Sequence, residues 1–221
     1  MNQINEYFSN LCTPHFDVVV ANSIVTDCGA IKAFKPFLKG KMGEFAVAVH
    51  VKLYLKDHYI LLNDLTLPDG EGATTQIDHL LLSPFGVFVI ETKNYKGWFF
   101  GSERQKQWTQ KIYKKSFKFQ NPIHQNYKHM KVLELVLSDI VDKDNMHSVI
   151  VFMPEAVFKT EMPSNVFRGT AWVDYVQTFQ QPVISEMKLK RIQLRLEKEI
   201  LEKSWKTNRQ HIEDLNQRHN S

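Results

Sequence analysis

The sequence predicts an α/β fold built on a buried sheet, and three patterns carry this prediction. Apolar residues follow helical spacing over residues 43–56, which indicates an amphipathic helix. Two apolar runs within residues 76–93 lack the alternation of a half-exposed sheet, so they indicate a β-hairpin that is buried on both faces. An Asn-Pro pair begins a helix over residues 121–137, and an apolar strand over residues 148–153 follows it.

Shorter elements complete the predicted order. A strand is expected over residues 58–65, and a loop with two glycines follows it. Short strands are also expected over residues 97–101 and 107–113, and a long charged helix over residues 182–205. We therefore expect an N-terminal segment, a core and a C-terminal extension, which span residues 1–38, 39–155 and 156–221.

Length and composition are those of an ordinary globular chain. The chain has 221 residues, of which 43% are hydrophobic, so it is long enough to bury a substantial core. Its net charge of +4 is compatible with a nucleic-acid partner. Two cysteines do not make a disulfide framework, no secretory signal is visible, and the apolar run at residues 18–21 is too short to cross a bilayer. We expect a cytoplasmic protein with no membrane segment.

The turn of the predicted hairpin fixes the register of its strands. Ser83-Pro84-Phe85-Gly86 has the residues of a type I turn. If Ser83 and Gly86 close this turn, Asp78 opposes Glu91 and Gln76 opposes Lys93. Opposed residues share one face of a sheet, so the register predicts that these four polar side chains cluster.

Two opposed carboxylates in a buried hairpin repel each other unless a cation lies near them. A divalent metal ion bound by Asp78 and Glu91 would remove this repulsion, and Lys93 would then orient or activate a water. The alternative is that Asp78 and Glu91 only form ion pairs with Lys93 and another base. Glu44 is a third candidate carboxylate, and its alternative role is a favourable interaction with the helix dipole.

Positive charge concentrates in residues 93–118, which contain eight basic residues, one acid and several aromatic residues. Basic side chains bind phosphates and aromatic rings stack on bases. The alternative is a solvated sheet edge with aromatic residues in the core. The candidate nucleic-acid contacts are Lys96, Arg104, Lys106, Trp108, Lys111, Lys114, Lys115 and, from the following helix, Gln125.

Three histidines near these residues are not expected to be ligands. His79 follows Asp78 and therefore faces the other side of the strand. His124 and His129 are expected to be surface or structural residues.

At these residues the sequence resembles the nuclease-related domain (NERD) family, a branch of the PD-(D/E)xK restriction-endonuclease-like superfamily. Ile77 stands where the superfamily signature has proline, which is usual in this branch, and the Gln-x-x-x-Tyr motif of RecB-like exonucleases is absent. The resemblance covers roughly residues 40–130. Its pieces are Gly40–Glu44, Asn63-Asp64, Gln76–His79, Gly86–Tyr95, Gly97, Gly101, Trp108 and Asn121–Gln125.

The resemblance implies a restriction-endonuclease-like core, which is a mixed α+β sheet with elements in the order α-β-β-β-α-β. It also implies Mg²⁺-dependent cleavage of DNA or another nucleic acid by a metal-activated water, with Mn²⁺ as a substitute. Asp78 and Glu91 would bind the metal and Glu44 would assist them; Lys93 would position the water. Gln76 and Gln125 would support the site. The alternatives are a binding module with little turnover and a phosphoesterase that acts on small nucleotides.

The expected C-terminal helix carries two apolar stripes on nearly opposite sides. A helix of this kind is usually enclosed between two surfaces, so we expect one stripe to pack on the core and the other to form a homodimer. The stripes are Leu189, Ile192, Leu196 and Ile200, and Met187, Leu194, Leu201 and Trp205.

Overall fold

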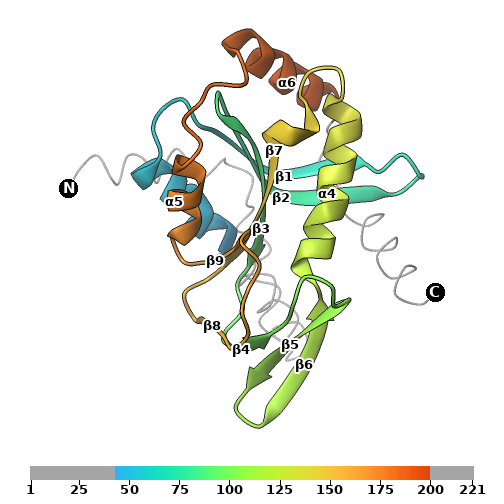
Figure 1. Cartoon of the computed structure of the whole chain (residues 1–221). Coiled ribbons are helices and arrows are strands. Elements are labelled where there is room, and N and C mark those ends of the chain that lie inside the picture. Colours follow the sequence, from blue (N-terminus) through green and yellow to red (C-terminus); the bar gives the residue numbers. More distant parts are fainter. Residues whose placement is uncertain (1–42, 200–221) are drawn as a thin grey trace, which may run out of the picture. The chain divides into compact units, whose positions relative to one another are not determined.

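The computed structural model describes residues 43–199 (Figure 1). The N-terminal segment and the predicted stripe residues Ile200, Leu201 and Trp205 lie outside this range.

A five-stranded mixed sheet forms the centre of the fold, in the order β1-β2-β3-β7-β9. β2 is antiparallel to both β1 and β3, whereas β7 runs parallel to β3 and β9 runs parallel to β7. This arrangement confirms the predicted mixed α/β architecture. The strands are β1 (Ile60–Pro68), β2 (Thr74–Ser83), β3 (Gly86–Lys93), β7 (Met146–Phe152) and β9 (Val166–Arg168).

Helices cover both faces of the central sheet (Figure 1). On one face, the helix over residues 43–54 and α5 (Ala171–Gln177) pack on β2 at Leu81. On the other face, α4 (Pro122–Leu137) and α6 (Glu186–Glu199) pack on β2 at Leu80 and Leu82. Both faces of β2 are therefore buried, which is why its sequence shows no apolar alternation.

A second sheet, in the order β6-β5-β4-β8, follows the central one along the chain. Its buried residues include Phe99 and Trp108, which pack against Phe152 of β7. Strands were predicted near β4 and β5, but β6 was missed, because most of its side chains are exposed and its main stabilising element is the pairing with β5. The elements are β4 (Gly97–Phe100), β5 (Gln107–Ile112), β6 (Lys115–Gln120) and β8 (Ala156–Phe158), and a short 3₁₀ helix spans Lys143–Asn145.

The predicted hairpin register is confirmed where β2 and β3 pair. Ser83 pairs with Gly86, and the ladder continues from there to His79 and Ile90. One step further the Asp78 side chain replaces a ladder bond, because its Oδ2 accepts a hydrogen bond of 2.8 Å from the Thr92 backbone N–H. The two strands thus separate where the polar residues begin.

Helix α6 buries one of its two apolar stripes. Leu189, Ile192 and Leu196 lie in the core cluster that includes α4, as expected for the stripe that packs on the domain. Met187 and Leu194 are 75% and 65% exposed, and the homodimer they suggested stays a prediction. None of the helices in residues 43–199 is long and apolar enough to cross a membrane.

Gly101 allows β4 and β5 to approach closely, and we expect its replacement by alanine to destabilise the fold. An added Cβ would lie 2.3 Å from Cδ2 of the buried Trp108 ring, so the ring or the backbone would have to move. Overpacking of this kind costs about 1–3 kcal/mol. Urea unfolding of Gly101→Ala should show this loss, whereas Ser116→Ala, at an exposed position of β6, should unfold like the parent protein.

Candidate functional site

The polar site begins with Asp78, at the point where β2 and β3 separate. Oδ2 of Asp78 accepts hydrogen bonds of 2.8 Å from both the backbone N–H and the hydroxyl of Thr92. Extended one step beyond its last pair, His79–Ile90, the hairpin register places Asp78 opposite Glu91, and the charge of Glu91 acts on the Asp78 carboxyl. The structure therefore brings the two predicted carboxylates together.

Glu91 is almost fully buried and forms an ion pair with Lys93. Its side chain is 2% exposed, and Nζ of Lys93 lies 2.5 Å from its Oε1. The same Nζ donates a hydrogen bond of 3.0 Å to Oε1 of Gln125, which projects from the first turns of α4. The contact between Lys93 and Gln125 places Gln125 in the site, as the resemblance implied.

His129 also belongs to the site, although only a surface or structural role was expected for it. Its Nε2 lies 3.3 Å from Oε2 of Glu91, and its Nδ1 lies 2.7 Å from the hydroxyl of Thr75. His129 is 5% exposed. The available signal was its spacing, because it follows Gln125 by one helical turn and so shares its face.

Asp64 is a second residue that the sequence did not assign to the site. It has a φ of 63°, and the β1–β2 ladder skips it between the pairs Asn63–His79 and Leu65–Ile77. Its Oδ1 accepts a hydrogen bond from the side-chain amide of Gln76. An acid beside the asparagine in an otherwise apolar strand was the signal available in the sequence.

Gln76 therefore does not complete the predicted polar square with Lys93. It pairs with Thr66 of β1 and bonds Asp64, because β2 and β3 pair only from His79 onward. His79 itself faces the other side of the sheet, as expected, and its Nδ1 lies 2.7 Å from Oδ1 of Asn63.

Glu44 is not brought into a common ligand set with Asp78 and Glu91. In residues 43–199 no group of three His, Cys, Asp or Glu residues is placed to hold a metal ion. The helix that carries Glu44 packs on the opposite face of the sheet, where Val47 joins the cluster of Leu81 and Ile90. The helix begins close to the end of β3, since a Cβ on Gly43 would lie 2.9 Å from Cβ of Asn94.

The electrostatics of the site favour an additional cation. Burial, with a further contribution from the charge of Glu91, raises the pKa of Asp78 to about 7. Burial would also raise the pKa of Glu91, but the charge of Lys93 and the contact with His129 outweigh it and lower that pKa. The pKa of Lys93 is raised, since Glu91 and Asp78 outweigh the opposite effect of burial. Lys93 therefore stays protonated, and Asp78 has no full positive partner of its own.

The free carboxylate oxygens suit a hard divalent cation. Oε2 of Glu91 is buried and has no hydrogen-bond partner within the described residues, despite its proximity to His129. Both hydrogen bonds to Asp78 fall on Oδ2. Mg²⁺ binds through one or two carboxylates and completes its shell with waters and substrate phosphates, so Asp78 and Glu91 provide a fitting donor set.

The predicted nucleic-acid contacts divide into exposed and buried residues. Lys96, Arg104, Lys106, Lys114 and Lys115 are exposed, and Lys111 is partly exposed. Trp108 is instead a core residue with 0% exposure, and its indole N–H donates to the carbonyl of Ser102. Its ring cannot stack on a base, which corrects the prediction for this residue.

Comparison with known proteins agrees with this geometry. Residues 39–153 match the model of the nuclease-related domain family, NERD. The chain belongs to this family. The NERD region contains every residue of the site described above, from Asp64 to His129.

A relative of the NERD chain is an uncharacterized protein of Bacillus anthracis, which is 44% identical over 123 residues. The match covers 55% of this chain and 58% of the relative, so the chain spans a little over half the length of the curated relative. No solved structure matches the chain. The family assignment establishes a nuclease-related domain, and the reaction itself is a matter for proposal.

Proposed function

We propose that this NERD domain is a metal-dependent nuclease that hydrolyses phosphodiester bonds of DNA, with Mg²⁺ as cofactor and Mn²⁺ as a substitute. The observation that supports this best is the proximity of two carboxylates, the half-buried Asp78 and the buried Glu91, beside the Lys93 ammonium. Such a pair is costly to bury without a cation. A site that binds and cleaves a phosphodiester accounts for that cost.

Each residue then has a distinct task. Asp78 and Glu91 would hold the cation through oxygens that no described hydrogen bond occupies. When bound, the cation supplies Lewis-acid stabilisation of the negative charge that develops on the phosphate. Lys93, protonated because its pKa is raised, donates to the attacking water or to the phosphate and does not act as a base.

Two residues of α4 keep these groups in place. Gln125 accepts a hydrogen bond from Lys93 and so fixes the direction of its ammonium. His129 lies beside the second oxygen of Glu91, while the Thr75 hydroxyl lies at its other ring nitrogen.

A second candidate is a nucleic-acid-binding module on the same fold with little turnover. The observation in its favour is that the exposed lysines lie on the second sheet and need no metal to bind phosphates. Binding that survives Glu91→Ala, in the absence of any cleavage, would support this candidate.

The direct test is incubation of the pure protein with linear duplex, circular duplex and single-stranded DNA. We expect DNA loss with Mg²⁺ or Mn²⁺, none with EDTA, and none with Glu91→Ala under any condition. The matched control is Glu186→Gln, at a glutamate of α6 that is 82% exposed, which should cleave like the parent protein. Cleavage of circular DNA would identify endonuclease action, and absence of cleavage in every reaction would contradict the nuclease proposal.

A further inference from the structure

The tip of the β5–β6 hairpin exposes an aromatic side chain that packing does not explain. The two strands pair as far as Ile112 and Lys115, which leaves Tyr113 and Lys114 as a two-residue turn. Tyr113 is 94% exposed and has a φ of 51°. Turns of this kind usually carry Gly, Asn or Asp where φ is positive, because a bulky residue is strained there. Fold stability alone therefore does not account for a tyrosine at this position.

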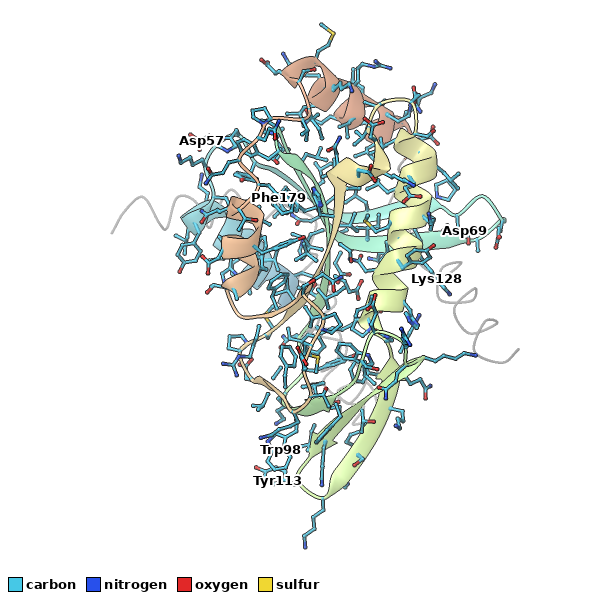
Figure 2. All side chains as sticks on the ribbon, in the orientation of Figure 1. Asp57, Asp69, Trp98, Tyr113, Lys128 and Phe179 are labelled. Carbon is cyan, nitrogen blue, oxygen red and sulfur yellow. The ribbon has the colours of Figure 1, made fainter. Side chains whose placement is uncertain are left out.

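Tyr113 lies between two hollows that contain aromatic and basic residues. Phe117 and Trp98, which are 47% and 48% exposed, belong to one hollow each. Trp98 and Tyr113 lie close together at the free end of the second sheet (Figure 2). The first hollow is lined by Ile112, Tyr113, Lys114, Lys115 and Phe117. The second is lined by Lys96, Gly97, Trp98, Lys111, Ile112 and Tyr113.

The charge around the tip is positive and largely uncompensated. Residues 96–120 contain seven basic residues and a single acid, Glu103. Lys114 and Lys115 are exposed, and in the described part of the chain neither forms an ion pair. Exposed rings beside unpaired lysines complement a ligand that has flat apolar faces and a negative backbone.

Both ends of the hairpin region are attached beside the carboxylate site. β4 begins at Gly97, shortly after Lys93, and α4, which supplies Gln125, begins directly after β6. The tip is at the end of β5 where β4 begins, because Trp98 pairs with Lys111, and the chain from Lys93 to Gly97 spans at most about 14 Å. A few nucleotides of single strand can cover this distance, so one strand could occupy both places.

We propose that the β5–β6 hairpin tip binds unpaired bases of nucleic acid, with Tyr113 stacked on a base and Lys114 and Lys115 on flanking phosphates. A base inside a double helix has both faces covered by its neighbours, so the tip selects single-stranded DNA or the unpaired part of a junction. The role of this tip beside an active site rests on the proposed nuclease function, but binding at the tip needs no cleavage.

The test is fluorescence anisotropy in EDTA with a labelled oligothymidylate of about 15 nucleotides, alone or annealed to oligoadenylate. Tyr113→Gly should weaken binding of the single strand at least about fivefold and leave the duplex unchanged. Tyr113→Phe keeps the ring and should bind like the parent protein. Glycine relieves the positive φ, so the melting temperature of Tyr113→Gly should stay constant or rise by up to about 4 °C. Weaker binding would then not reflect unfolding.

Two further measurements complete the test. Lys114→Gln and Lys115→Gln should each reduce the salt dependence of single-strand binding by about 0.7 in the log–log slope. The control is Tyr54→Ala, because Tyr54 is 52% exposed and lies in the helix over residues 43–54. This variant should bind the single strand and the duplex like the parent protein. Undiminished single-strand binding by Tyr113→Gly, or equal losses for single strand and duplex, would overturn the inference. DNA cleavage by the parent protein is measured in a separate assay. If no cleavage is found, the nuclease proposal fails, but the binding measurements still test the role of the tip.

Discussion

Lys93→Met is expected to abolish DNA cleavage and to leave divalent-metal binding intact or tighter, whereas Glu91→Ala should abolish both. Nζ of Lys93 lies 2.5 Å from Oε1 of Glu91, so the ammonium competes with a cation for that carboxylate. Methionine fills a similar volume without the charge, which frees Glu91 for the metal. The lost ammonium removes stabilisation of developing charge, and loss of such a group costs at least about a hundredfold in rate.

The measurement pairs single-turnover cleavage with Mn²⁺ titration by calorimetry. Asp78→Ala should behave like Glu91→Ala in both assays. Lys131→Met is the matched control, because Lys131 forms a more exposed ion pair with Glu134 on the same helix as His129. Unimpaired turnover in Lys93→Met would contradict the assignment of Lys93, and unimpaired turnover in Asp78→Ala or Glu91→Ala would contradict the metal site.

The parts of the fold that local chemistry determines were predictable from the sequence. The turn from Ser83 to Gly86 fixes its own register, which holds as far as the pair His79–Ile90 and leads to Asp78 and Glu91 at the next position. The N-cap of α4 was also predicted, and the Asn121 side chain accepts a hydrogen bond from the backbone N–H of Ile123. Strand β6 was missed because its stability comes from pairing with β5 and its own residues are mostly exposed.

The candidate site was predictable within the hairpin and, through the family resemblance, at Gln125 of α4. The helix that carries Glu44 covers one particular face of the sheet because Val47 packs against distant strands. No spacing in the sequence reveals which face this is. The same holds for Trp108, which is buried by contacts with Phe152 and Phe119. It also holds for His129, which contacts Glu91 although the two residues lie far apart in the sequence. Tertiary packing decides whether an aromatic or a histidine is core, ligand or surface.

Asp78→Asn is expected to stabilise the metal-free protein at alkaline pH. The pKa of Asp78 is raised from 3.8 to about 7, so between these values the native state binds a proton that the unfolded state has released. Stability from this group therefore falls as pH rises from about 4 to about 7 and stays low above it. Asparagine is neutral, retains an oxygen that can accept from Thr92, and should gain about 1–3 kcal/mol near pH 8.

The pH dependence and the response to metal together distinguish a cation site from a simple ion-pair cluster. The gain from Asp78→Asn should shrink as pH falls and vanish near pH 4, where the native and unfolded states of the parent protein are both protonated at this residue. Mg²⁺ should raise the melting temperature of the parent protein near pH 8 and have little effect on the variant, because a ligand stabilises only the state that binds it. The control is Asp139→Asn, since Arg195 lowers the pKa of that surface carboxyl and its neutralisation should give no gain. A parent protein that is more stable than Asp78→Asn near pH 8 without metal would mean that Lys93 already compensates both carboxylates, and the requirement for a further cation would disappear.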